Sequence, residues 1–153
     1  MSFAEDIGRY IQQEYPNTYG LPVSLNFTPD NTTDSISVYD TGGMPAERAY
    51  GGCPPLPRPS AQVMVRHSSP NTARIISEEL YDLLDGIYNQ AVNETQYLII
   101  ECNAPPTYIG AEQVSTAGKA HEFTLNLSSL CCEEQYALLR KTHHSNTHQP
   151  RRY

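Results

Sequence analysis

A chain of 153 residues with 39% hydrophobic side chains is long enough to bury one hydrophobic core, and we expect a single domain. Only 18% of the residues are charged, whereas 11 are tyrosines. This balance favours a subunit that buries surface against neighbours, because interfaces are rich in tyrosine and poor in charge. The net charge of −7 argues against nucleic-acid binding as the main work of the protein, since an acidic surface repels phosphate.

The charges are unevenly distributed along the chain. All 17 acidic residues lie at or before Glu134, and residues 1–139 have a net charge of −11. Residues 140–153 have a net charge of +4, from Arg140, Lys141, Arg151 and Arg152. Such a basic end is typical either of an arm that docks on an acidic neighbour or of a solvated tail.

The N-terminus does not predict a signal peptide. Its first 15 residues include four charged ones and no apolar core, and no apolar run in the chain approaches the roughly 20 residues that cross a bilayer. We therefore expect assembly in the cytoplasm without a membrane partner. In that compartment the four cysteines are expected to stay reduced: Cys53, Cys102, Cys131 and Cys132.

The first 40 residues predict a helix and two strands. Ser2 and Glu5 form a capping box, and apolar residues then recur at helical spacing, so we expect a helix over residues 3–15. Alternating apolar residues predict strands at 23–27 and 35–39. Because these strands are close in sequence, we expect them to form a hairpin.

The second strand runs into Asp40-Thr41-Gly42-Gly43, where the apolar alternation ends. Aspartate and glycine favour tight turns, so we expect a sharp turn whose N–H groups donate to the Asp40 carboxylate. Residues 42–60 then form a proline-rich loop, which we interpret as an arm that reaches a partner subunit rather than an idle surface loop. Its prolines exclude a central strand over residues 51–59.

The rest of the chain predicts a strand at 61–66, a helix and two further strands. The helix begins at Ser69-Pro70 and follows a leucine stripe to Ile87, with Gly86 inside it. The apolar run at 97–102 predicts a strand buried on both faces, and 123–127 a last strand. We expect a long connection over 104–120, weak helical character over 130–141, and no core residues from 142 onward.

Together these elements predict an α+β domain over residues 1–132. We expect a single mixed or antiparallel sheet of about four to five strands, with two helices packed on one face and long projecting loops. Residues 133–153 form a C-terminal segment that ends in a polar, basic arm.

The middle third of the chain resembles the tail-terminator, or tail-completion and minor capsid, proteins of long-tailed bacteriophages. The motifs that carry the resemblance are Tyr39-Asp40-Thr41-Gly42-Gly43 with Pro45 after it, the strand at 61–66, and the helix at 73–87. The flanks match in layout only.

The resemblance implies a structural virion protein at the head–tail neck. Such a protein closes the tail tube as a homo-oligomeric ring, six-fold in tail terminators generally, and ends tube polymerisation. The implied partners are further copies of the chain, the tail tube protein and the neck or head-completion protein. DNA would pass through without specific binding, which suits an acidic body. Another neck or minor capsid subunit of the same fold is the alternative.

We expect the ring contacts to come from the turn, the long loop and the basic end. The residues concerned are Asp40, Gly42, Gly43, Pro54, Pro57, Arg58, Arg151 and Arg152.

Two chemical sites are alternatives to this interpretation. Asp40-Thr41-Gly42 matches the aspartic-protease signature, but the second apolar-apolar-Gly motif of that fold has only Tyr108-Ile109-Gly110 as a poor candidate. A zinc site could draw on Cys131, Cys132, His143, His144 and His148, although adjacent cysteines lack the usual separation of zinc ligands. We therefore expect no enzyme, no cofactor and no metal site, while metal binding by the cysteine pair and the His-rich tail stays open.

Overall fold

The computed structural model describes residues 2–16, 18–47, 56–114 and 118–132. Its elements are α1 (Phe3–Glu14), β1 (Val23–Leu25), β2 (Ser35–Glu47), β3 (Leu56–His67), α2 (Pro70–Leu84), β4 (Ile87–Val92), β5 (Thr95–Cys102), β6 (Thr107–Val114) and β7 (Gly118–Cys132). The expected α+β class with one mixed sheet is confirmed. Within the described residues, however, the sheet has seven strands rather than four to five.

The sheet is built around β3 and the long strand β7. The strand order is β1-β2-β3-β7-β5-β4, and β6 pairs with β7. β3 lies along one side of β7. The other side of β7 pairs first with β6, up to Thr107 opposite Thr124, and then with β5, from Cys102 opposite Leu127. In the part of the chain that the structure describes, β1 and β2 are parallel and the other strand pairs are antiparallel.

The expected hairpin between the first two strands is wrong, because β1 and β2 are parallel. Asn26 has a left-handed backbone conformation at the end of β1, and the chain then returns over the face of the sheet that carries no helix. The Pro29 carbonyl accepts a hydrogen bond from Arg66 Nη1 of β3 at 3.3 Å, and Thr28 contacts Tyr39 of β2. This return path lets the chain re-enter beside β1 in the same direction.

Both helices start where the sequence predicts. Ser2 accepts from the Glu5 backbone N–H and Glu5 reaches back to Ser2, which completes the capping box. Ser69 caps α2, with Pro70 at its first turn. The helix ends at Leu84, short of the expected Ile87, because Gly86 lies in the turn before β4 with a φ of +77°.

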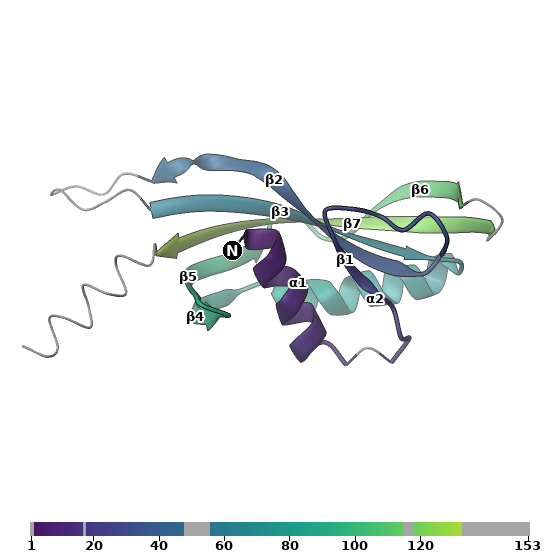
Figure 1. Cartoon of the computed structure of the whole chain (residues 1–153), viewed down its shortest axis with the longest axis horizontal. Coiled ribbons are helices and arrows are strands. Elements are labelled where there is room, and N and C mark those ends of the chain that lie inside the picture. Colours follow the sequence, from purple (N-terminus) through teal and green to yellow (C-terminus); the bar gives the residue numbers. More distant parts are fainter. Residues whose placement is uncertain (1, 17, 48–55, 115–117, 133–153) are drawn as a thin grey trace, which may run out of the picture.

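The two helices cover the same face of the sheet (Figure 1), as expected. Apolar residues of both helices and of the inward face of the strands are fully buried between these layers: Ile7, Ile11, Ile36, Val38, Val63, Ile76, Leu80, Leu125 and Leu127.

Most of the loop expected at 42–60 is strand instead. β2 continues to Glu47 and β3 starts at Leu56, while residues 48–55 lie outside the described part of the chain. Pro57 and Pro59 lack an N–H, but β7 supplies side-chain donors to their carbonyl groups. Ser129 Oγ donates to the Pro59 carbonyl at 2.9 Å and Cys131 Sγ to the Pro57 carbonyl at 3.7 Å. These bonds allow a proline-rich strand to lie between β2 and β7.

Three further expectations are corrected. Much of residues 104–120 forms strand β6 and the start of β7, and residues 130–132 end β7 rather than start a helix. Residues 133–141 lie outside the described residues. β5 is not buried on both faces: only Tyr97 and Ile100 are buried, and Glu101 is exposed.

Candidate assembly surface

Five of the eight expected interface residues lie together in the β2–β3 ribbon: Asp40, Gly42, Gly43, Pro57 and Arg58. The other three, Pro54, Arg151 and Arg152, lie outside the described residues. At this end of the sheet the described chain leaves β2, re-enters at β3 and leaves again from β7 (Figure 1). The five described residues of the expected set therefore share one ribbon.

Asp40 has a structural role, but not within a turn of its own. Its Oδ1 accepts the backbone N–H of Ala4 in the first turn of α1 at 3.0 Å, and Oδ2 accepts the Asn26 side-chain amide at 3.3 Å. The Asp40 N–H in turn donates to Asn26 Oδ1 at 2.9 Å. A carboxylate at a helix N-terminus stabilises the helix dipole. Both carboxylate oxygens of Asp40, the residue considered for protease chemistry, thus accept hydrogen bonds from other parts of the protein.

Gly42 and Gly43 do not turn the chain back, because β2 continues through them as a bulge. The pairing with β3 shifts between Thr41 and Met44, and Gly43 has a φ of +68°. The Gly43 N–H donates to Ser60 Oγ at 2.9 Å. A bulge of this kind adds local twist to a strand, and here it shapes the exposed end of the ribbon.

Next to this ribbon a row of apolar side chains crosses the helix-free face. Leu130 points to that face, because Leu125 and Leu127 point to the helices and side chains alternate along a strand. Ile99 pairs with both Leu130 and Tyr88, and Tyr88 is 68% exposed.

The same row reaches β2 and β3. Met44 pairs with Arg58 and is 56% exposed. Arg58 lines a small hollow together with Ile99 and Leu130. Sequence reasoning missed this row, because its members come together only through the strand register. An apolar patch of this kind is typical of a contact surface.

The opposite end of the sheet is the β6–β7 hairpin, which also exposes apolar side chains. Tyr108 and Ile109 are 49% and 51% exposed. The Tyr108 ring packs against His121 and Phe123 of β7, with ring centroids 6.2 and 5.2 Å apart.

Ion pairs of the buried Arg66 link this hairpin to β3. Arg66 of β3 is only 3% exposed, and its Nε lies 3.1 Å from Glu122 Oε1 and its Nη2 3.8 Å from Glu112 Oε2. Burial raises the pKa of Glu122, and so does the neighbouring Glu112, against the opposing effect of Arg66. The ion pairs therefore hold the hairpin to β3, while Tyr108 and Ile109 of β6 stay exposed.

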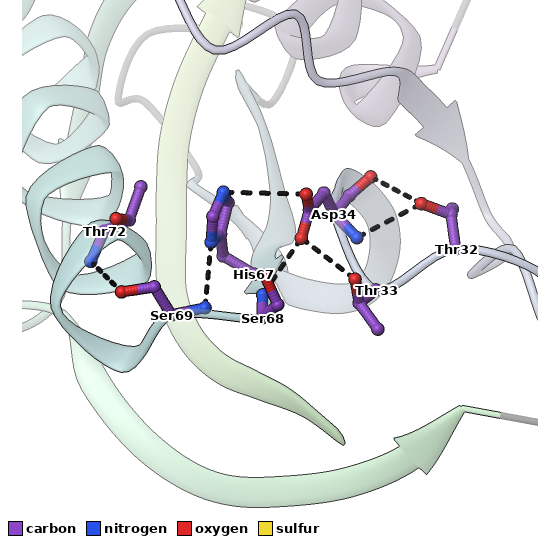
Figure 2. Close-up of polar contacts among 7 residues, drawn as sticks. All are labelled: Thr32, Thr33, Asp34, His67, Ser68, Ser69 and Thr72. Atoms are coloured by element: carbon purple, nitrogen blue, oxygen red, sulfur yellow. Dashed lines mark hydrogen bonds and ion pairs between the residues drawn. The ribbon is translucent and has the colours of Figure 1, made fainter. Parts of the chain in front are cut away.

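A polar cluster at the end of β3 resembles a hydrolase triad in composition but not in geometry (Figure 2). Asp34 Oδ2 lies 3.6 Å from His67 Nε2, but His67 Nδ1 accepts the backbone N–H of Ser69 rather than its hydroxyl. The Ser69 hydroxyl instead accepts the Thr72 N–H as the cap of α2. The cluster therefore holds the start of α2 against the loop before β2.

The described residues contain no group of three or more His, Cys, Asp or Glu side chains that could hold a metal ion. Cys131 is buried in β7, and the three histidines considered as its partners, His143, His144 and His148, lie outside the described part. No helix within the described ranges is long and apolar enough to cross a membrane.

Residues 6–127 match the family of bacteriophage tail terminator proteins. This stretch includes nearly the whole sheet, all of α2 and most of α1, and the chain belongs to that family. The resemblance noted from the sequence is thereby confirmed. Membership assigns the protein a structural role in the phage tail, and thus a place in the virion.

A solved structure shares the fold. A chain from the virion of a native gene transfer agent (GTA) particle superposes with a TM-score of 0.58 at 11% identity, covering 86% of this chain and 96% of its own length. A second solved structure has a TM-score of 0.46 at 17% identity, covering 84% of this chain and 96% of its own length. No curated protein has a significantly similar sequence.

Proposed function

We propose that this protein closes the tail tube as a homo-oligomeric ring, ends tube polymerisation and presents a surface to the neck or head-completion protein. The observation that carries the proposal is the match to the tail terminator family over residues 6–127. Six copies per ring is the expectation for such a protein, and the work it does is geometric rather than catalytic.

The shape of the sheet supports ring formation. One edge is formed by the short strand β1 and the free part of β2, and the other by β4 and β6. When one edge of a subunit contacts the other edge of the next subunit, two unlike surfaces meet and the contact is heterologous. Heterologous contacts generate a closed ring when the rotation from each subunit to the next closes. A two-fold dimer would need a self-complementary surface instead.

The two ends of the sheet support contacts above and below a ring. The apolar row with Tyr88 and Met44 lies at one end, and Tyr108 and Ile109 at the other. We assign one of these ends to the tail tube protein and the other to the neck protein. The net negative charge of the body is consistent with DNA passing through the ring without specific binding.

The proposal is tested by removing the gene from its phage and measuring tail lengths by electron microscopy. Without a terminator, tubes should exceed their normal length and vary widely, and supplying the protein in trans should restore one length. Tails of normal length that fail to join heads would contradict the proposal and would place the protein at another level of the neck.

A further inference from the structure

A groove lies between α2 and the connection from β5 to β6. It has a volume of about 400 Å³, within the range of sites that bind small groups. Its walls include the rings of Tyr81, Pro105, Pro106 and Phe123. The α2 side also contributes three charged residues, Arg74, Glu78 and Asp82.

The rim of the groove is negative. Arg74 is already paired, because its Nη1 donates to Glu78 Oε1 at 2.9 Å and its Nη2 to Asn71 Oδ1 at 3.0 Å. The Asp82 side chain is exposed, and no hydrogen bond or ion pair joins it to another described residue. Asp85, also exposed, continues the same acidic stripe about one turn further along the chain. The groove therefore offers an apolar floor beside an unneutralised carboxylate.

The last residues of the chain have the complementary chemistry. Residues 140–153 carry four basic side chains and no acidic one, and the chain ends Arg151-Arg152-Tyr153. A guanidinium pairs with a carboxylate through a planar fork and stacks on aromatic rings. A tyrosine ring suits an apolar floor that is open to water at one side.

The chain length allows this contact. β7 ends at Cys132, nine residues after Phe123 on the groove wall, which is roughly 30 Å along a strand. The 21 residues from 133 to 153 span up to roughly 70 Å when extended.

We propose that the basic C-terminal end of one copy docks in the α2 groove of the neighbouring copy. The inference rests on the proposed ring, in which every subunit gives one tail and receives another. A donor segment and an acceptor groove at separate places on the subunit form a heterologous contact. The ion pairs set the register of the ring, and salt weakens them.

A charge-swap experiment on the full-length protein tests the location. The double substitution Arg151→Glu with Arg152→Glu should weaken self-association about tenfold or more, and Asp82→Lys should do the same. Combining all three substitutions should restore much of the loss. Glu94→Lys, at the exposed β4–β5 turn, is the matched control with the same change in net charge. Equal effects of Asp82→Lys and Glu94→Lys would overturn the assignment to the groove.

A crosslinking experiment tests which copy supplies the tail. Full-length Arg152→Lys protein is prepared with ¹⁴N and with ¹⁵N, mixed, and treated with a carbodiimide that joins amines to touching carboxylates. The expected product joins position 152 of a copy labelled with one isotope to Asp82 or Glu78 of a copy labelled with the other. Crosslinks within one isotope only, or none to α2, would overturn the proposal. If the mass of the assembly shows a ring in that case, the proposed function still stands; a lone monomer would contradict both.

Discussion

At the scale of single residues, Gly43 combines two features that exclude a side chain. Its φ of +68° lies in the left-handed region, and a Cβ at this position would meet the Arg58 carbonyl oxygen at 3.0 Å. Gly42, next to it, has no such φ, and a Cβ there would have nothing within 4 Å. The bulge thus needs glycine at only one of its two positions.

Gly43→Ala should lower the free energy of unfolding by about 1–2 kcal/mol, because an alanine in left-handed backbone costs about that much before any clash. Gly42→Ala should change the free energy of unfolding by less than about 0.5 kcal/mol, because Gly42 is exposed and has room for a side chain. Urea unfolding of the two variants beside the wild type measures both values. Equal losses would show that the bulge does not depend on Gly43.

Cys102 should be an unreactive thiol. Burial, and next the charge of Asp85, raise its pKa to about 12. Since only the thiolate reacts, alkylation of Cys102 at pH 8 should be more than about tenfold slower in the folded protein than in urea. Asp85→Asn should speed the reaction only in part, because burial is the larger cause. Peptide mapping of the labelled protein gives the rates, and a folded-state rate equal to the rate in urea would contradict the raised pKa.

At the scale of elements, a buried carboxylate joins α1 to the sheet. Asp6 is fully buried, and it accepts hydrogen bonds from the Tyr97 hydroxyl of β5 at 2.5 Å and from the Asn93 amide at 3.0 Å. At the other end of α1 the Tyr15 hydroxyl donates to Glu79 of α2 at 2.6 Å. Glu79 is exposed, so water can replace that donor.

Tyr97→Phe should lower the free energy of unfolding by about 1.5–3 kcal/mol, because it leaves a buried charge with one donor fewer. Tyr15→Phe is the matched change and should cost less, since Glu79 stays hydrated. Chemical denaturation of both variants compares them. A larger loss for Tyr15→Phe would contradict the role assigned to Asp6.

The Tyr97 substitution should also change the pH dependence of stability. Burial first, and then Asp6, raise the pKa of the Tyr97 hydroxyl above its usual value of about 10. The folded state therefore holds this proton when the unfolded state loses it, and the stabilisation present below about pH 10 declines as the pH rises further. The difference in stability between wild type and Tyr97→Phe should shrink above about pH 10, and a constant difference would contradict this linkage.

The sequence predicts those elements whose signals are local. The capping box at Ser2 and the Ser69-Pro70 start define both helices, because caps and periodicity act within a few residues. β4 was missed, since this edge strand is buried only at Ile87 and Val92 and shows no alternation. The strand at Pro57 and Pro59 could not be predicted, because its stability depends on Ser129 and Cys131, which are 70 or more residues away.

The candidate site was predictable to the same degree. The Asp40–Gly43 stretch and Arg58 were both named as interface residues, and the β2–β3 ribbon places them on neighbouring strands. The partner of Asp40 was not predictable, since the N-terminus of α1 is 36 residues away in sequence. The apolar row through Tyr88 and Leu130 was also hidden, because a row across strands depends on pairing register rather than on sequence spacing.

At the scale of the whole molecule, the two helices stiffen one face of a sheet whose ends extend beyond them (Figure 1). Such a subunit has a rigid centre and exposed apolar side chains at both ends, with two unlike edges between them. These features suit a wedge that contacts like copies at its edges and different proteins at its ends. The function we propose therefore depends on shape and self-association.

The mass and symmetry of the protein assembled with its tail tube protein test this claim most directly. Light scattering and negative-stain imaging should show a six-fold ring of 17.1 kDa subunits, about 103 kDa for the ring itself, seated on the end of the tube. A protein that stays a 17.1 kDa monomer beside its tube protein, and is absent from purified particles, would contradict the proposed role.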